Sequence, residues 1–181
     1  MASNSNLPLQ LVECTLDQHG PQILEIFNDA IVNSTALYDY HPRSLESMDA
    51  WFAAKHAGNF PVIGAVNPDG VLAGFASFGT FRNFPAYKYT VEHSVYVHRD
   101  FRGQGIGALL LEAVIDAAKA RELHALVGAI DADNRASISL HEKFGFDRVG
   151  TLPQVGFKFG RWLDLAFYQL TLTTPDDPRD G

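Results

Sequence analysis

The sequence predicts an α+β fold, a single domain in which helices cover the faces of a mostly antiparallel sheet. The chain has 181 residues, which is the size of one ordinary domain. Strand-like and helix-like segments mix along it in the order βααβββαβαββ. A meander of consecutive strands precedes the long helix that begins near Gly105, whereas a doubly wound parallel sheet alternates strands and helices from its start.

The first half of the chain contains two helical segments among four strands. Apolar residues recur at helical spacing from Gln22 to Ile31, and Ser44 is expected to cap a second helix that runs through Trp51 and Phe52. The turn sequence Asn-Pro-Asp-Gly at 67–70 separates two apolar runs and therefore predicts a hairpin. The expected strands are 9–14, 61–66, 71–78 and 89–97.

The second half is dominated by a helix from Gly105 to Ala120, where apolar residues form one continuous stripe. A shorter helix is expected from Ala136 to Phe144, because a glycine at 145 commonly ends a helix. Strands are expected at 125–130, 146–152 and 163–172.

Composition limits the class of protein. Hydrophobic residues make up 46% and charged residues 19%, which excludes a disordered chain, and no apolar run approaches the ~20 residues of a membrane span. The N-terminus has no signal-peptide pattern, and the single cysteine, Cys14, is expected to be a buried, unreactive thiol. These features predict a cytoplasmic protein that does not bind membranes.

Charge and the chain ends lead to two further expectations. The net charge is −7 and no basic stripe is present, which argues against a nucleic-acid partner. Residues 1–6 and the acidic tail 173–181 are expected to be flexible, which leaves 7–172 as the domain.

The most informative segment is VYVHRDFRGQGIG at 95–107, in which a strand runs into glycines and then into the long helix. Glycine permits a ligand to approach the backbone, and the N–H groups and dipole of a helix N-terminus bind phosphate. A pyrophosphate-bearing ligand is therefore expected. Gly103-x-Gly105-x-x-Ala108 also matches a dinucleotide fingerprint formally, with Asp131 as the ribose-binding acid, so a nicotinamide enzyme stays open.

Arg102-x-x-Gly105-x-Gly107 after Val-Tyr-Val resembles the acetyl-coenzyme A (acetyl-CoA) signature of GCN5-related N-acetyltransferases. The segments TVEHSVYVHRDFRGQGIG, IDADNRASISLHEKFGF and VGFKFGRWLDLAFYQL resemble the phosphinothricin and methionine sulfoximine (sulfone) branch. The resemblance implies acetyl transfer from acetyl-CoA directly to the α-amine of a small amino-acid analogue. A non-catalytic acyl-CoA sensor is the alternative. The resemblance also implies a homodimer, with 156–162 either packed across a two-fold axis or forming an intrachain loop.

The resemblance implies two groups of coenzyme-binding residues. Backbone groups of the strand would pair with the pantetheine arm, and the glycine-rich turn would hold the pyrophosphate. Asn134 would contact the coenzyme, although it also suits a helix cap. The implied residues are Val95, Tyr96, Val97, Arg102, Gly103, Gln104, Gly105, Ile106, Gly107, Ala108 and Asn134.

Glu92 is the implied general base, acting directly or through water, and His141 the implied donor of a proton to the departing thiolate. Each also has an ordinary structural alternative, as an exposed glutamate or a satisfied histidine. No metal is expected, because the histidines lack ligand spacing.

The implied substrate residues lie in two short segments. Arg82 would grip a carboxylate or the tetrahedral oxygens of the substrate with paired hydrogen bonds. Phe84 stands where phosphinothricin-specialised enzymes tend to carry a second basic residue, which favours methionine sulfone or sulfoximine. The implied residues are Arg82, Asn83, Phe84, Glu92, His93 and Ser94.

Overall fold

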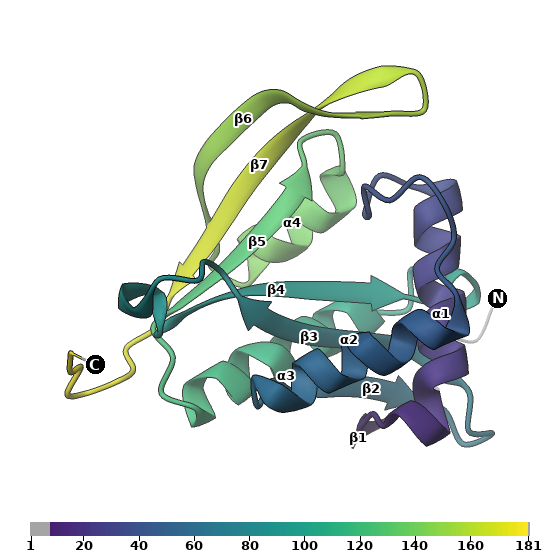
Figure 1. Ribbon diagram of the computed structural model, residues 1–181, viewed down its shortest axis with the longest axis horizontal. Helices are drawn as coiled ribbons and strands as arrows, with labels where there is room; N and C mark the ends of the chain where they lie inside the picture. Colours follow the sequence, from purple (N-terminus) through teal and green to yellow (C-terminus); the bar gives the residue numbers. More distant parts are fainter. Residues whose placement is uncertain (1–7, 181) are drawn as a thin grey trace, which may run out of the picture.

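The computed structural model describes residues 8–180, in which one sheet of seven strands has the order β1-β2-β3-β4-β5-β7-β6 (Figure 1). Neighbouring strands are antiparallel except for β4 and β5, which are parallel. This confirms the predicted α+β class and the predicted order of elements. The strands are β1 (Gln10–Glu13), β2 (Val62–Val66), β3 (Leu72–Thr80), β4 (Thr90–Val97), β5 (Ala125–Asp131), β6 (Asp147–Lys158) and β7 (Arg161–Thr171).

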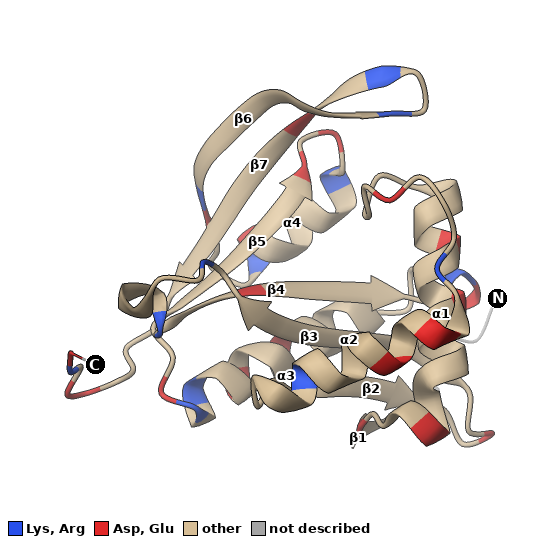
Figure 2. Ribbon diagram, viewed as in Figure 1, with Lys and Arg blue, Asp and Glu red and all other residues tan. Residues whose placement is uncertain are grey.

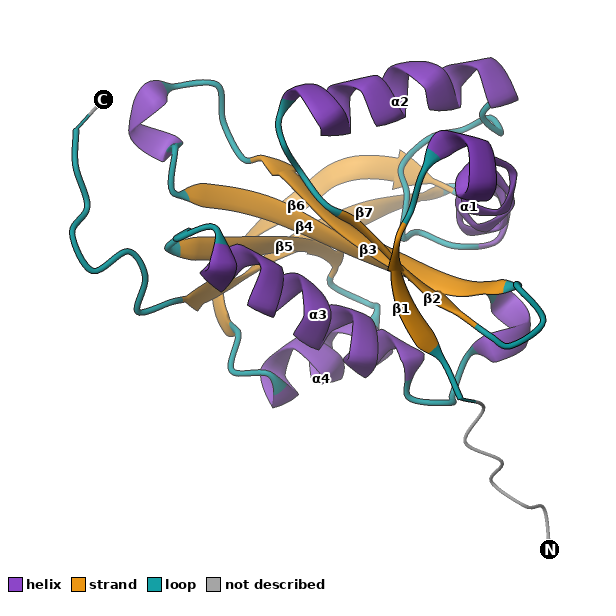
Figure 3. Ribbon diagram, turned by 90° about the horizontal axis from the view of Figure 1, so that it is seen from below, coloured by secondary structure: helices purple, strands orange, loops and turns teal. Residues whose placement is uncertain are grey.

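Helices lie on both faces of the sheet (Figure 3). The helices α1 (Leu16–Asn33) and α2 (Leu45–Ala57) cover one face, and α3 (Ile106–Ala120) and α4 (Arg135–Lys143) cover the other. Two single-turn helices, η1 (Pro85–Tyr87) and η2 (Arg99–Phe101), flank β4. Each face has its own apolar core, one around Phe27 and Phe75 and the other around Leu110 and Leu126.

Helix α1 and strands β6 and β7 extend beyond the bounds that the sequence predicted. Helix α1 begins at Leu16 rather than Gln22, because the Thr15 hydroxyl accepts a hydrogen bond from the Gln18 amide and the helix continues through Pro21. Strands β6 and β7 extend into the segment 156–162, where Phe159 and Gly160 have φ of 52° and 73° and form a two-residue turn. That segment is therefore the tip of an intrachain hairpin.

The sheet opens between β4 and β5. These two strands pair only from Thr90 to Glu92 on β4, whereas β3 stays paired with β4 as far as Val97. Strand β7 likewise follows β5 to Asp131. Beyond Glu92 the parallel strands diverge, as Figure 1 shows, and the edge of β4 that faces β5 keeps unpaired backbone groups.

Residues 1–6 lie outside the described part of the chain, and the tail lies on the surface, where the Tyr89 hydroxyl is 3.1 Å from the Arg179 amide. Flexibility of the tail stays a prediction. Cys14 is buried, as predicted, and burial raises the pKa of its thiol to about 12. Among residues 8–180 we find no helix long and apolar enough to cross a membrane.

Candidate active site

A cavity of about 810 Å³ occupies the opening between β4 and β5 and reaches both faces of the sheet. Because side chains alternate along a strand, β4 contributes two different walls. Val95 and Val97 pack with the α3 side, whereas Tyr96 packs with Phe27 on the α1 side. The predicted residues that line the cavity are Glu92, His93, Ser94, Val95, Tyr96, Val97, Arg102, Gly103, Gly105, Ile106, Gly107, Ala108, Asn134 and His141.

The glycine-rich turn presents bare backbone at the mouth of the cavity. Gly103 and Gly105 have φ of 77° and 81°, and a Cβ at either position would meet nothing within 4 Å. Gly105 is the N-cap of α3, so the amides of Ile106 and Gly107 have no carbonyl within the helix to donate to. The Ala108 amide already donates to the Gly105 carbonyl at 3.1 Å. The turn therefore fits an anionic group such as a pyrophosphate.

Replacing Gly105 with alanine is expected to weaken acetyl-CoA binding about tenfold or more, because the new Cβ fills space that the ligand needs. Gly70→Ala is the matched control, since Gly70 has φ of 79° and equally open surroundings in a turn of the β2–β3 hairpin. Both variants carry the same backbone strain, so calorimetry on the folded proteins should find weaker binding only for Gly105→Ala. Equal affinities would remove the turn from the coenzyme site.

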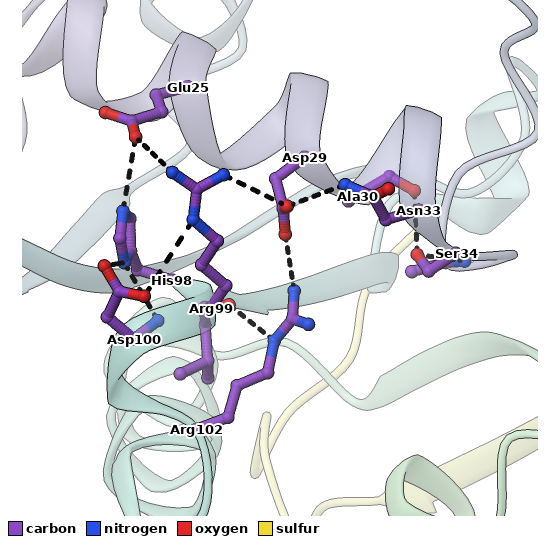
Figure 4. A network of polar contacts seen from close by, with 11 residues as sticks. Glu25, Asp29, Ala30, Asn33, Ser34, His98, Arg99, Asp100 and Arg102 are labelled. Atoms are coloured by element: carbon purple, nitrogen blue, oxygen red, sulfur yellow. Dashed lines mark hydrogen bonds and ion pairs between the residues drawn. The ribbon is translucent and has the colours of Figure 1, made fainter.

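Arg102 belongs to an ionic network that joins the turn to α1 (Figure 4). Its guanidinium donates to the Asp29 carboxylate at 2.8 Å and to the Val97 carbonyl at 3.3 Å. Arg99 lies 3.6 Å from the same carboxylate and 3.7 Å from Glu25. The Asp29 side chain is 10% exposed and binds both guanidinium groups, so α1 holds the two arginines beside the turn. Figure 2 shows that other Lys and Arg residues are spread over several elements.

The two other predicted coenzyme ligands differ in their placement. The Asn134 side-chain oxygen accepts from the Ser137 amide at 3.1 Å and caps α4, which leaves its NH₂ group free to donate into the cavity. Gln104 instead donates to the Asp100 carbonyl and does not line the cavity. Asn134 therefore suits both of its predicted roles, whereas the structure does not place Gln104 at the cavity.

His93 and His141 form a buried pair on the α4 side of the opening. Their Nε2 atoms are 2.9 Å apart, and His141 Nδ1 lies 2.7 Å from the Ser137 carbonyl. Since a carbonyl can only accept a hydrogen bond, neutral His141 carries its hydrogen on Nδ1 and accepts at Nε2 from His93. Gly128 leaves room for both rings, because a Cβ there would lie 3.1 Å from His93.

The pair is neutral near pH 7. Burial, reinforced by His141, lowers the pKa of His93 to about 3, and burial also lowers the pKa of His141. Both His141 nitrogens are engaged, so protonating a thiolate requires the ring to change a partner, and that role stays a prediction. His93 points away from the face that carries Glu92 and Ser94, which separates it from the other predicted substrate residues.

Glu92 is the last β4 residue paired with β5, and its side chain faces the α1 side of the opening. The side chain is accessible to solvent, yet the surrounding strands remove part of its hydration, which raises the pKa of the carboxyl. The Arg82 guanidinium opposes that shift. A carboxylate with a raised pKa beside an open cavity is suited to accept a proton.

The predicted substrate segment 82–84 lies outside the cavity lining. Arg82, Asn83 and Phe84 are all exposed, and the Arg82 guanidinium lies 5.1 Å from the Phe81 ring. Only Arg82 acts on the site in this structure, through its charge at Glu92. Substrate contacts by the three residues stay predictions.

Sequence reasoning missed the loop between α1 and α2. Residues 34–38 of this loop line the cavity, although the sequence there has neither helical nor strand periodicity. Asp131 also lines it, but its Oδ1 accepts from the Asp133 amide and Arg161 lies 3.6 Å away. Its side chain is turned away from the α3 side, where a ribose-binding acid would be needed.

A mostly antiparallel sheet that opens between two parallel strands, with a glycine-rich helix entry at its mouth, is the arrangement expected of a coenzyme-dependent acyltransferase. Residues 22–146 match the model of the acetyltransferase (GNAT) family. The chain belongs to this family. It is an N-acetyltransferase, so the sensor and nicotinamide alternatives are set aside.

Named relatives agree with the branch that the sequence resembled. The chain is 49% identical to an L-methionine sulfoximine/L-methionine sulfone acetyltransferase of Pseudomonas paraeruginosa, over 84% of this chain and 88% of that protein. It is 35% identical to a phosphinothricin N-acetyltransferase of Streptomyces coelicolor, over 83% and 89%. A phosphinothricin acetyltransferase from Sinorhizobium meliloti, solved with acetyl-CoA, is 32% identical with a TM-score of 0.87, over 91% and 88%.

Possible metal ligands are dispersed. Within residues 8–180, His, Cys, Asp and Glu nowhere gather in threes in an arrangement that could hold a metal ion.

Proposed function

We propose that the protein acetylates the α-amine of a small amino-acid analogue by direct transfer, with methionine sulfone or sulfoximine preferred over phosphinothricin. The observation that carries the proposal is the position of Glu92, which combines a raised pKa with a place where the sheet opens. The preference rests on Phe84, an uncharged side chain in the predicted substrate segment. The names of the relatives support this class of substrate.

Bound acetyl-CoA supplies the acetyl thioester that the amine attacks. The turn at 103–107 and Asn134 bind the coenzyme, and Glu92 takes the amine proton, directly or through water. The unpaired β4 edge at 95–97 offers N–H groups to the oxyanion. His141 supplies the proton that the thiolate takes up. For this last step His141 must first become imidazolium, because a neutral imidazole is too weak an acid to protonate a thiolate, and its burial opposes that protonation. The proton comes from the attacking nitrogen, which loses one when the tetrahedral intermediate collapses to the amide.

A panel of amino acids with acetyl-CoA, followed by thiol release and by the mass of the product, tests the proposal. Methionine sulfone and sulfoximine should give a higher kcat/KM than phosphinothricin or methionine. Thiol release no faster than background hydrolysis with every compound would contradict it.

We also propose that the protein is a cytoplasmic homodimer that uses the β6–β7 hairpin as its interface. Strand β6 is a sheet edge, and large apolar side chains along the hairpin are exposed. Phe157 and Trp162 lie together near its tip, with ring centroids 5.1 Å apart.

Sedimentation should give twice the chain mass of 19.9 kDa for the wild-type protein and the chain mass for Trp162→Glu. A charge at Trp162 would have to be buried in the interface, which is costly. Leu45→Glu, at an exposed apolar residue of α2, is the control and should stay dimeric. A wild-type monomer at micromolar concentration would refute the dimer.

A further inference from the structure

The α1–α2 loop, residues 34–44, forms part of the cavity wall without regular structure of its own. Residues 35–38 line the cavity, with Leu37 and Tyr38 providing the large side chains. Neither the β-ladder nor a helix fixes these residues, so their position depends on contacts that the loop makes elsewhere.

One buried lysine contacts both the loop and the end of α1. Lys158, at the end of β6, is 4% exposed, and its ammonium group donates to the carbonyls of Ile31, Ser34 and Leu37 at 2.6, 2.9 and 2.6 Å. An ammonium group has three N–H donors, so the three carbonyls satisfy it fully. The Ile31 carbonyl belongs to the last turn of α1, and the Ser34 and Leu37 carbonyls belong to the loop.

The same hairpin touches the loop at two further points. The Tyr40 hydroxyl donates to the Phe157 carbonyl at 2.8 Å. The Tyr38 ring packs over Gly156, where a Cβ would lie 2.7 Å from the ring. Lys158 is the buried centre of this contact, whereas Tyr40 is an exposed edge of it.

We propose that Lys158 is a positioning residue of the acceptor pocket. By binding three carbonyls it holds the α1–α2 loop where Leu37 and Tyr38 close the cavity opposite the diverging strands. A carbonyl cluster of this kind is specific to a cation, so an apolar side chain of similar length cannot replace it. The inference rests on the proposed function, since it assigns the loop to the amino-acid side of the reaction.

Lys158→Met is the principal test, because methionine keeps the length and removes the charge. The KM for methionine sulfone should rise about tenfold or more, whereas the dissociation constant of acetyl-CoA should stay within about twofold. Lys158→Arg retains the charge in a planar group and should have an intermediate KM. Tyr40→Phe, which removes one exposed hydrogen bond, and Lys119→Met, which removes an exposed charge on α3, are the matched controls and should change KM by less than about threefold.

Hydrogen exchange in the protein without substrate gives a readout independent of activity. Amides at 34–40 should exchange faster in Lys158→Met than in the wild type, while those of β3 and α3 remain unchanged. Unchanged exchange or an unchanged KM in a folded variant would overturn the proposal, as would an equal loss of coenzyme affinity, which indicates general destabilisation. If Lys158→Met does not fold, the same readouts on Lys158→Arg decide. A wild-type protein that acetylates no amino acid would refute the proposed function instead, and the exchange experiment would still decide whether Lys158 holds the loop.

Discussion

Replacing Glu92 with glutamine is expected to lower turnover by a factor of about 10²–10⁴, the usual effect of removing a general base. The substitution keeps the shape of the side chain and removes its basicity. Because the glycine-rich turn is a separate part of the cavity, the dissociation constant of acetyl-CoA should stay unchanged. Glu112→Gln, at an exposed position of α3, makes the same chemical change away from the site and should leave turnover unaltered.

The proposed role of Glu92 also predicts how turnover depends on pH. Glu92 acts as a base only when ionised, and desolvation raises its pKa, so wild-type turnover should fall as pH falls through that raised pKa. The glutamine variant should lack this acidic limb. Its deficit should shrink at high pH, where more of the amine is already deprotonated. Wild-type turnover in Glu92→Gln at neutral pH would show that Glu92 is not the base.

The sequence was sufficient for the fold and for the conformation of the glycine-rich turn, because both depend on local patterns. Helical spacing in α3, the hairpin turn at 67–70 and the glycines at 103 and 105 each have a conformational cause that neighbouring residues determine. Errors arose where the determinant was subtle or distant. Thr15 extends α1 through a single hydroxyl, and the turn at Phe159 requires a left-handed conformation that a phenylalanine rarely adopts.

The acceptor half was less predictable because it is assembled from segments distant in sequence. Leu37 lines the cavity, and its carbonyl accepts from Lys158, which follows it by more than a hundred residues. The pairing of His93 with His141 likewise joins β4 to α4, and no spacing rule anticipates it. Arg82 was predicted through the resemblance alone, and its exposure in the structure makes it the residue whose role most needs a measurement.

Arg82→Ala should raise the KM for methionine sulfone by about 10- to 150-fold, the equivalent of a charge-assisted hydrogen bond worth ~1.5–3 kcal/mol. Coenzyme affinity should not change, since loss of ground-state binding affects only the substrate that the arginine contacts. Lys88→Ala removes another exposed cation, just after η1 in the same connection between β3 and β4, and is the control. If Arg82 only faces solvent, both variants will have the wild-type KM, and the proposed substrate class will lose its main polar contact.

A second readout follows from the charge of Arg82, and it does not depend on substrate contact. Arg82 lowers the pKa of Glu92, so its removal should raise that pKa further and move the acidic limb of the kcat/KM profile to higher pH. Phe84→Arg adds a cation to the same segment; it should improve phosphinothricin relative to methionine sulfone, because the phosphinate carries the additional negative charge. A shifted pH profile with an unchanged KM would mean that Arg82 tunes the base without gripping the substrate. An elevated KM together with the shift is what we expect, because Arg82 then serves both the binding of the amino acid and the ionisation of Glu92.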